Sequence, residues 1–410
     1  MSILYRQQKN ILLSLLFSII ITVCNYFINN CPYPYFDTLD KYCWSEYFLR
    51  IVSSKEYNDS DAYFLDVGYD KQIADYSLED GTKGKVAVTD RKKLLSFLKT
   101  AQQAYSEGNQ YKYIFIDIRF IKETYTEDDS ALINQINKMN NIGYSSHLKY
   151  TTNDSLKLEK AAINDFFTTI TATNVTRYEF LQTVNDSLME SAPIKIYKAI
   201  NGESSHPIIN KGWLYTSNGR LCNNSPFMVI NSDFHKTYVG TGCDNYAHLG
   251  AHWLSRYPPE VIEATNGDTI ALSSKNVGLA IKDKIVIIGD YVNDLHDTYC
   301  GAQPGPYLIY LAYKELQDKK HIISWPFILL MIIVYTIIGV FILAKKSLWN
   351  YIPFTRRTKN RLLKLLLNFI GYSTLLTLIT IIMYLMFHAT YNIFIPSVVF
   401  SFVRTIKSSY

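Results

Sequence analysis

The chain has 410 residues, 48% of them hydrophobic, and carries a formal net charge of +5. This length is more than one ordinary domain needs. The excess positive charge is largely accounted for by one basic segment, residues 345–364, so the composition does not indicate a nucleic-acid-binding protein. Attraction to anionic lipid explains this segment, and a docking site for an acidic partner is the alternative.

The first apolar run covers residues 11–28, which is long enough to cross about 30 Å of hydrocarbon as a helix. Arg6 and Lys9 precede it without an acidic residue, which favours a cytoplasmic N-terminus. A cleaved signal peptide is the alternative for residues 1–28, but no small-x-small cleavage site follows the apolar core. Nor is the sequence before Cys24 a good lipobox. We therefore predict an uncleaved transmembrane anchor over residues 1–28.

A polar stretch, residues 29–322, follows and is long enough to form a complete α/β domain. Apolar runs typical of buried strands alternate in it with segments of helical spacing. Strands are predicted at 62–70, 111–121, 141–150 and 283–292, and helices at 89–108, 126–139 and 306–320. This alternation predicts a parallel or mixed sheet covered by helices.

Two segments inside this stretch have a different character. Residues 151–200 are more polar and are predicted to be mainly helical. The segment after them is predicted to be rich in strands, because dipeptides that favour tight turns recur in it. These dipeptides are Asn201-Gly202, Asn218-Gly219 and Asn266-Gly267.

Five of the six cysteines fall on the predicted outer side of the membrane, where disulfides persist. Cys31 with Cys43 would staple the segment next to the membrane, and Cys222 with Cys243 would close a local loop. Cys300 is then left free or paired between chains. The sequence contains no C-x-x-C spacing, so it does not indicate a zinc knuckle. The sequence contains glycosylation sequons at Asn58, Asn153, Asn174, Asn185 and Asn223. They would matter in a eukaryotic secretory pathway, and chance occurrence is the alternative.

Apolar runs return near the end of the chain, at residues 323–344 and 365–387, and each is long enough to cross a membrane as a helix. The loop between them, residues 345–364, holds seven Lys and Arg residues and no Asp or Glu. The positive-inside rule places this loop in the cytoplasm and residues 29–322 outside it.

A last apolar run, residues 391–403, is shorter and is interrupted by Pro396. A short kinked span, a re-entrant helix and an interfacial helix all fit this pattern. Arg404 and Lys407 follow the run and favour a cytoplasmic C-terminus, which requires a fourth crossing. We therefore expect one transmembrane helix before the α/β domain and two to three after it.

Acidic side chains gather where the predicted strands end, which is the edge at which open α/β sheets bind ligands. The candidate ligand-binding residues are Asp66, Asp117, Asp290, Asp294, His296 and Asp297. Three interpretations of this group are open: ordinary turn and capping roles, a ligand-binding site, and a metal or catalytic site.

Catalytic signatures are absent from the sequence, which holds no G-x-S-x-G, H-E-x-x-H, P-loop or G-x-G-x-x-G motif. His248 and His252 have the spacing of a metal-binding pair if they lie on a helix, but no carboxylate accompanies them and a surface pair is the simpler interpretation. We therefore predict a protein that is not an enzyme, has no catalytic residues and holds neither a metal nor a cofactor.

Several short motifs occur in order along residues 60–140 and 280–320. They are Leu65-Asp66-Val67, Thr89-Asp90-Arg91, Asp117-Ile118-Arg119-Phe120, Asp128-Asp129-Ser130-Ala131-Leu132, Ile287-Ile288-Gly289, Asp297 and Pro304-Gly305. In these motifs the chain resembles the CHASE2 family, the extracellular sensory domains of bacterial receptors, in which one transmembrane helix precedes the domain and usually three follow. The resemblance implies an α/β sensory domain outside the membrane.

The chain departs from that family in two motifs and in its output. Ile309-Tyr310 stands where the family often has His-Ala, and the Trp-Pro expected before the helix arginine is missing near Arg91. Receptors of the family typically continue into a kinase or cyclase, whereas only seven residues follow Val403. The resemblance therefore extends to the fold and the sensory character, not to a catalytic output.

These observations lead to one functional hypothesis. A bacterial cytoplasmic-membrane protein of several spans binds an unknown ligand outside, at the ends of strands 63–67, 113–118 and 284–289. Helix 306–320 then passes the signal through the membrane to a separate membrane or cytoplasmic signalling protein. Association into a homo-oligomer is left open. The rival classes are a scaffold component of an envelope complex and a membrane-acting effector.

Overall fold

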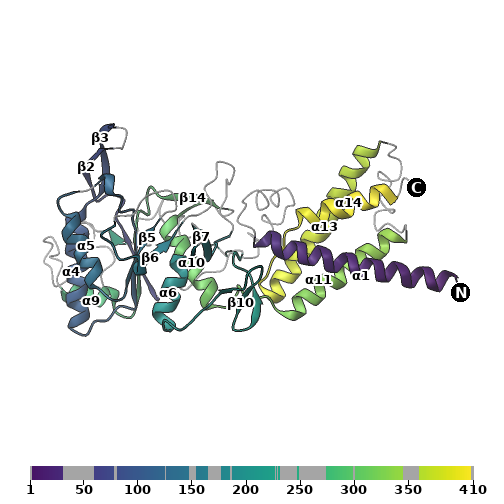
Figure 1. Cartoon of the computed structure of the whole chain (residues 1–410), viewed down its shortest axis with the longest axis horizontal. Coiled ribbons are helices and arrows are strands. Elements are labelled where there is room, and N and C mark those ends of the chain that lie inside the picture. Colours follow the sequence, from purple (N-terminus) through teal and green to yellow (C-terminus); the bar gives the residue numbers. More distant parts are fainter. Residues whose placement is uncertain are drawn as a thin grey trace.

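An α/β domain and a bundle of helices follow one another along the long axis of the molecule (Figure 1). The computed structural model describes residues 2–30, 60–77, 81–124, 126–146, 154–164, 177–184, 187–226, 228, 230, 247–248, 274–298, 301–344 and 360–407. The predicted layout, a parallel-sheet core with apolar helices at both ends of the chain, is confirmed.

The core of the α/β domain is a sheet of six parallel strands in the order β12-β1-β13-β4-β5-β6. The strands are β1 (Ala62–Asp66), β4 (Tyr113–Asp117), β5 (Ile142–Ser146), β6 (Ala161–Ile163), β12 (Ala247–His248) and β13 (Ile285–Gly289). All four strands predicted by range are confirmed, and β1, β4 and β13 are shorter than expected. Because β13 lies between β1 and β4, the carboxyl ends of these three strands lie side by side.

Helices cover both faces of the sheet, because successive side chains of β13 point to opposite faces and all of them are apolar. Ile285 and Ile287 belong to one apolar core, and Val286 and Ile288 belong to the other. The first core is covered by α6 (Ala192–Asn201) and α10 (Gly305–Gln317), and the second by α4 (Arg91–Ser106), α5 (Asp129–Lys138) and α9 (Ser274–Ile281).

Helix α4 shows how the sequence sets these elements. The Asp90 side chain accepts a hydrogen bond from the Lys93 N–H at 2.9 Å and so caps the first turn. Its apolar residues, Leu94 and Leu98 among them, are fully buried. The helix ends two residues before Gly108, whose φ of 98° suits glycine. The helix predicted at 89–108 is therefore confirmed, as are those at 126–139 and 306–320.

The prediction that residues 151–200 are mainly helical is wrong for the part of this segment that the structure describes. The described part of this segment holds a single 3-10 turn (Leu158–Lys160), strand β6, a hairpin of β7 (Leu181–Val184) and β8 (Ser187–Glu190), and then α6. Strands of three or four residues are too short to show a period of two, so their pattern was not visible in the sequence.

Besides the β7–β8 hairpin, three smaller β structures are present in the described residues. The hairpin of β2 (Lys71–Ser77) and β3 (Lys83–Thr89) projects away from the sheet (Figure 1). A second hairpin joins β14 (Leu295–Thr298) to β15 (Gly301–Pro304). In the described part of the predicted β-rich segment, β9 (Ile209–Asn210), β10 (Tyr215–Ser217) and β11 (Arg220–Cys222) form a three-stranded sheet, and the turn predicted at Asn266-Gly267 lies outside the described residues. Positive φ angles at Asn218 and Gly219 confirm the predicted turn there.

The bundle is built from α1 (Ser2–Asn29), α11 (Trp325–Leu343), α13 (Arg361–Phe387) and α14 (Phe394–Lys407). The first three are long and apolar enough to cross a membrane. Helix α14 has 14 residues, about 21 Å, and runs back along α13. We had expected Pro396 to interrupt this segment. It lies instead in the first turn of α14, where proline is tolerated.

Candidate ligand-binding pocket

A cavity of 460 Å³ lies at the carboxyl edge of the sheet, beside the ends of β13 and β4. Strand β3 forms one wall, and the segments that follow β4 and β13 form others. Its ionisable lining residues are Asp117, Asp290, Asp294, Lys71, Arg91, Arg119 and His296. Three carboxylates thus stand against three permanent cations, which suits a ligand that is neutral overall or carries both charges.

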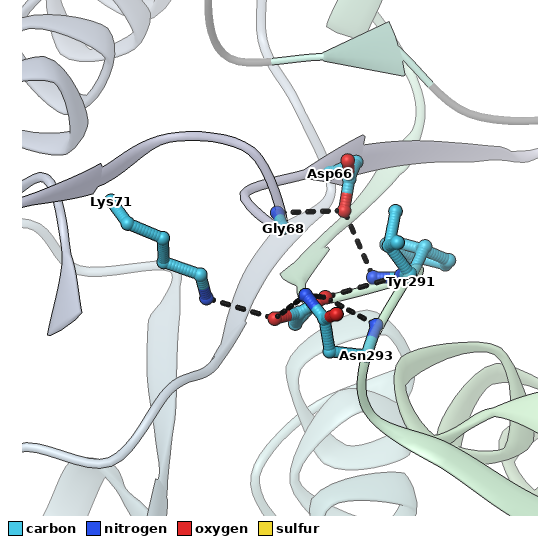
Figure 2. Close-up of polar contacts among 7 residues, drawn as sticks. Asp66, Gly68, Lys71, Tyr291 and Asn293 are labelled. Atoms are coloured by element: carbon cyan, nitrogen blue, oxygen red, sulfur yellow. Dashed lines mark hydrogen bonds and ion pairs between the residues drawn. The ribbon is translucent and has the colours of Figure 1, made fainter. Parts of the chain in front are cut away.

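Asp66 lies beneath this edge and has a structural role. It ends β1, is fully buried, and accepts hydrogen bonds from the N–H groups of Gly68 and Tyr291, both at 2.9 Å (Figure 2). These bonds tie the loop after β1 to the loop after β13. The capping interpretation therefore holds for Asp66, which does not line the cavity.

Asp290 is held at the pocket wall by a cation and by its own turn. Its Oδ2 lies 2.8 Å from Lys71 Nζ, and its Oδ1 accepts the N–H groups of Val292 at 3.1 Å and Asn293 at 2.8 Å (Figure 2). Burial by itself would raise the pKa of Asp290, but the hydrogen bonds from Lys71 and Asn293 outweigh it and lower the pKa. Asp290 is therefore a fixed anion.

Asp117 enters the pocket from the end of β4 and takes part in a chain of polar contacts. Its Oδ1 accepts a hydrogen bond from Asn164 Nδ2 at 2.7 Å, and Asn164 Oδ1 accepts one from the Tyr178 hydroxyl at 2.9 Å. Asn164 directly follows β6. The chain thus links the pocket floor to the face covered by α6 and α10.

Asp294 and His296 meet at the start of α10. Asp294 Oδ1 lies 3.2 Å from His296 Nε2. A Cβ atom on Gly305, the first residue of α10, would come within 2.5 Å of Asp294 Oδ2 and 3.0 Å of His296 Nε2, so a larger residue there would displace the Asp294 carboxylate. Asp297 is exposed on β14 and does not line the cavity. Side chains alternate across a strand, which turns Asp297 away from the face that His296 uses.

Arg91 supports the floor of the pocket. It is 1% exposed, its guanidinium lies 5.0 Å from the Phe120 ring centroid, and its Nε is 3.4 Å from Asp129 Oδ1. Burial lowers its pKa and the Asp129 carboxylate opposes that change. Arg91 therefore joins α4, α5 and the segment after β4.

Several residues of the site were missed by the sequence analysis. Lys71 and the wall from Val86 to Thr89 belong to the β2–β3 hairpin, which was not predicted. The sequence offers one signal for it, the turn-forming pair Asp80-Gly81 between two runs of strand-like residues. Asn164 carried no signal, because it follows a strand of only three residues.

The disulfide predicted between Cys222 and Cys243 stays a prediction, because Cys243 lies outside the described residues. Cys222 is buried in the apolar core, and burial raises the pKa of its thiol to about 12. The other predicted disulfide residues, Cys31, Cys43 and Cys243, lie outside the described residues, as does Cys300.

Other sequence candidates are placed only in part. His248 lies in strand β12 rather than on a helix, and His252 is not described. Asn223 is buried and accepts a hydrogen bond from Asn30 at 3.2 Å, which leaves no room for a glycan, and the remaining sequons are not described. Among the described residues, no group of three or more His, Cys, Asp or Glu side chains is arranged to hold a metal ion.

Comparisons with known proteins give no match: no protein-family model, curated protein or solved structure matches this chain.

Proposed function

We propose that this chain is a sensor anchored in the bacterial cytoplasmic membrane, with its α/β domain outside the cell membrane and its pocket open to a small polar ligand. The observation that carries the proposal is the position of α10. This helix begins against Asp294 and His296 at the pocket, and only seven residues separate its end from α11, the first candidate span after the α/β domain.

Helix α10 is tightly packed at its pocket end. A Cβ atom on Gly289 would lie 2.2 Å from Pro306 Cγ, so the end of the central strand and the first turn of α10 touch directly. Tyr307 and Tyr310 of α10 pack edge-on against Phe64 of β1, with ring centroids 5.7 and 5.2 Å apart. Because close-packed elements move together, a ligand that changes the strand ends displaces α10.

The link from α10 to the membrane is also held by main-chain contacts. Asn223 N donates to His321 O at 2.8 Å, and Ile323 N donates to Leu221 O at 2.9 Å. These bonds clamp the connection between α10 and α11 onto strand β11. A displacement of α10 therefore reaches both the connection and the sheet that rests on it.

Two further points support a binding role over catalysis. The acids at the strand ends are held by fixed partners: Asp66 by main-chain N–H groups and Asp290 by Lys71. General acid–base catalysis instead needs a group whose pKa lies near the working pH. The motifs that resemble the CHASE2 family, including Arg91 and Gly305, also gather around this pocket, which agrees with a sensory domain. We propose that a separate membrane or cytoplasmic protein receives the signal.

The test is thermal stabilisation of the full chain in lipid nanodiscs by a library of zwitterionic metabolites, such as amino acids, dipeptides and betaines. A true ligand at a hundredfold its dissociation constant stabilises the folded state by about 2.7 kcal/mol. We expect Asp294→Asn to abolish the stabilisation. The matched control, Asp297→Asn, lies outside the cavity and should keep it.

Hydrogen exchange then tests transmission. The bound ligand should change amide protection in α10 and in the segment 318–324 as well as at the pocket. Stabilisation that survives Asp294→Asn would reject this pocket. A response confined to the pocket would reject signalling through α10 and favour the scaffold interpretation.

A further inference from the structure

The small sheet of β9, β10 and β11 carries an exposed apolar loop beside the bundle. Trp213 is 80% exposed, and Leu214 and Ile209 are 44% and 41% exposed. Lys211 stands in the same loop, whose turn is closed by a hydrogen bond from Lys211 N to Leu214 O at 2.8 Å. The loop has a defined conformation, yet its indole is left in solvent.

Helix α1 fixes the position of this loop along the bundle. The Tyr26 hydroxyl accepts a hydrogen bond from Tyr215 N at 3.0 Å and donates one to Cys222 O at 3.2 Å. Tyr26 lies within one turn of the end of the candidate span Gln7–Asn29. That span of 23 residues is about 34 Å long, slightly more than the hydrocarbon core, so Tyr26 falls in the boundary region.

A contact near helix α11 independently places the β9–β11 sheet at the same depth, the membrane boundary. Leu221 O accepts the hydrogen bond from Ile323 N, two residues before Trp325, which begins the second candidate span and is 74% exposed. Indole rings are enriched at this depth because one part of the ring is apolar and its N–H is polar. The sheet is thus held at the membrane boundary from two sides.

We propose that the 211–214 loop dips into the outer headgroup region of the bilayer, with Trp213 and Leu214 in contact with lipid and Lys211 among the phosphates. The lipid is favoured as occupant because Trp213 and Leu214 are exposed apolar side chains and the sheet that carries them is tied to Tyr26 and Ile323, next to the ends of two candidate spans. This contact would set the tilt of the sensory domain on the membrane. It rests on the proposed membrane placement of α1 and α11 and not on the ligand.

The experiment uses the full chain in bilayers of phosphatidylcholine that is brominated near the headgroup end of its acyl chains, compared with unbrominated lipid. Tryptophan emission is recorded for the wild type, Trp213→Phe and Trp325→Phe, and each difference isolates one indole. Both side chains are mostly exposed, so phenylalanine leaves the packing intact.

We expect the emission of Trp213 and of Trp325 to be quenched by brominated lipid. Quenching of Trp325 alone would overturn the loop proposal while leaving the membrane placement intact. No quenching of either indole would overturn the membrane placement itself. Trp213 that is unquenched by bromine and yet shielded from aqueous acrylamide would show a protein contact, such as a second copy, in place of lipid.

Discussion

Glu179 shows how one buried side chain can make the contact between the two parts of the molecule depend on pH. Its side chain is 9% exposed, and burial raises its pKa to about 8. Asn224 Nδ2 lies 3.4 Å from its Oε1, and the N–H of the same Asn224 donates to Asn30 Oδ1 at the end of α1. Glu179 is therefore protonated at neutral pH, and its ionisation would place a charge beside this junction.

The pH dependence of stability follows from this pKa. Between about pH 4.5 and 8 the unfolded chain releases the Glu179 proton while the folded chain retains it, so the free energy of unfolding falls by up to ~1.4 kcal/mol per pH unit. Glu179→Gln should remove this slope in thermal unfolding of the reconstituted chain. Exposed Glu203→Gln is the control and should keep it. An unchanged slope in Glu179→Gln would contradict the prediction.

The ion pair between Lys71 and Asp290 can be measured by a double-mutant cycle. We expect Lys71→Met and Asp290→Asn to show a coupling of about 1 kcal/mol in unfolding experiments, because the pair is direct and partly shielded from solvent. The coupling should shrink as salt is added. Additive effects of the two substitutions would show that Asp290 is held by its turn alone.

At the scale of elements, α1 and α11 meet along a polar seam. Ser14 lies against Gly339, at 3.0 Å from the position its Cβ would take, and Ser18 Oγ is 2.7 Å from Thr336 Oγ1. Asn25 Nδ2 donates to the Tyr335 hydroxyl at 3.0 Å. Small residues allow helices to approach closely in lipid, and the polar contacts fix their register. The seam makes α1 part of a packed bundle rather than a simple anchor.

Gly339→Leu tests this seam. The added side chain would displace Ser14 and separate α1 from α11, so the bundle should lose about 1–3 kcal/mol, the usual cost of overpacking. Denaturation of the chain in mixed micelles with increasing SDS measures the loss. Ile337→Leu, on the exposed side of the same helix, should be nearly neutral. Equal effects of the two substitutions would argue against a tight seam.

At the scale of the whole molecule, helix orientation decides which side of the membrane each part occupies. The first turn of α1 and the last turn of α14 lie at the end of the bundle far from the α/β domain (Figure 1). Asn368 of α13 donates to Thr405 of α14 at 3.3 Å, which sets the two helices antiparallel. This arrangement agrees with a fourth membrane crossing by α14. That crossing stays a prediction, because α14 is short for a span.

A reporter fused to the C-terminus checks this topology in a bacterial host. We expect green fluorescent protein fused after residue 410 to fluoresce and alkaline phosphatase fused there to be inactive, since the positive-inside rule predicts both ends in the cytoplasm. A phosphatase inserted into the 211–214 loop should be active. Activity of the phosphatase at the C-terminus would mean that α14 does not cross and only three helices do.

The sequence by itself determined the features that depend on local pattern. Runs of apolar residues predicted α11 and α13, helical spacing such as that of Leu94 and Leu98 predicted α4, and the apolar run before Asp290 predicted β13. Four of the six candidate site residues line the cavity, because the carboxyl ends of parallel strands share one edge. Such features are encoded within a few residues of one another.

Tertiary structure alone decided which side chains meet across the chain. Lys71 reaches Asp290 because an unpredicted hairpin lies beside the sheet, and Asn164 reaches Asp117 because β6 joins the edge of the sheet. Asp66 and Asp297 are equally plausible as ligands in the sequence, but one is buried under the edge and the other points outside the cavity. Contacts between residues far apart in the chain depend on strand order and packing, which no local pattern specifies.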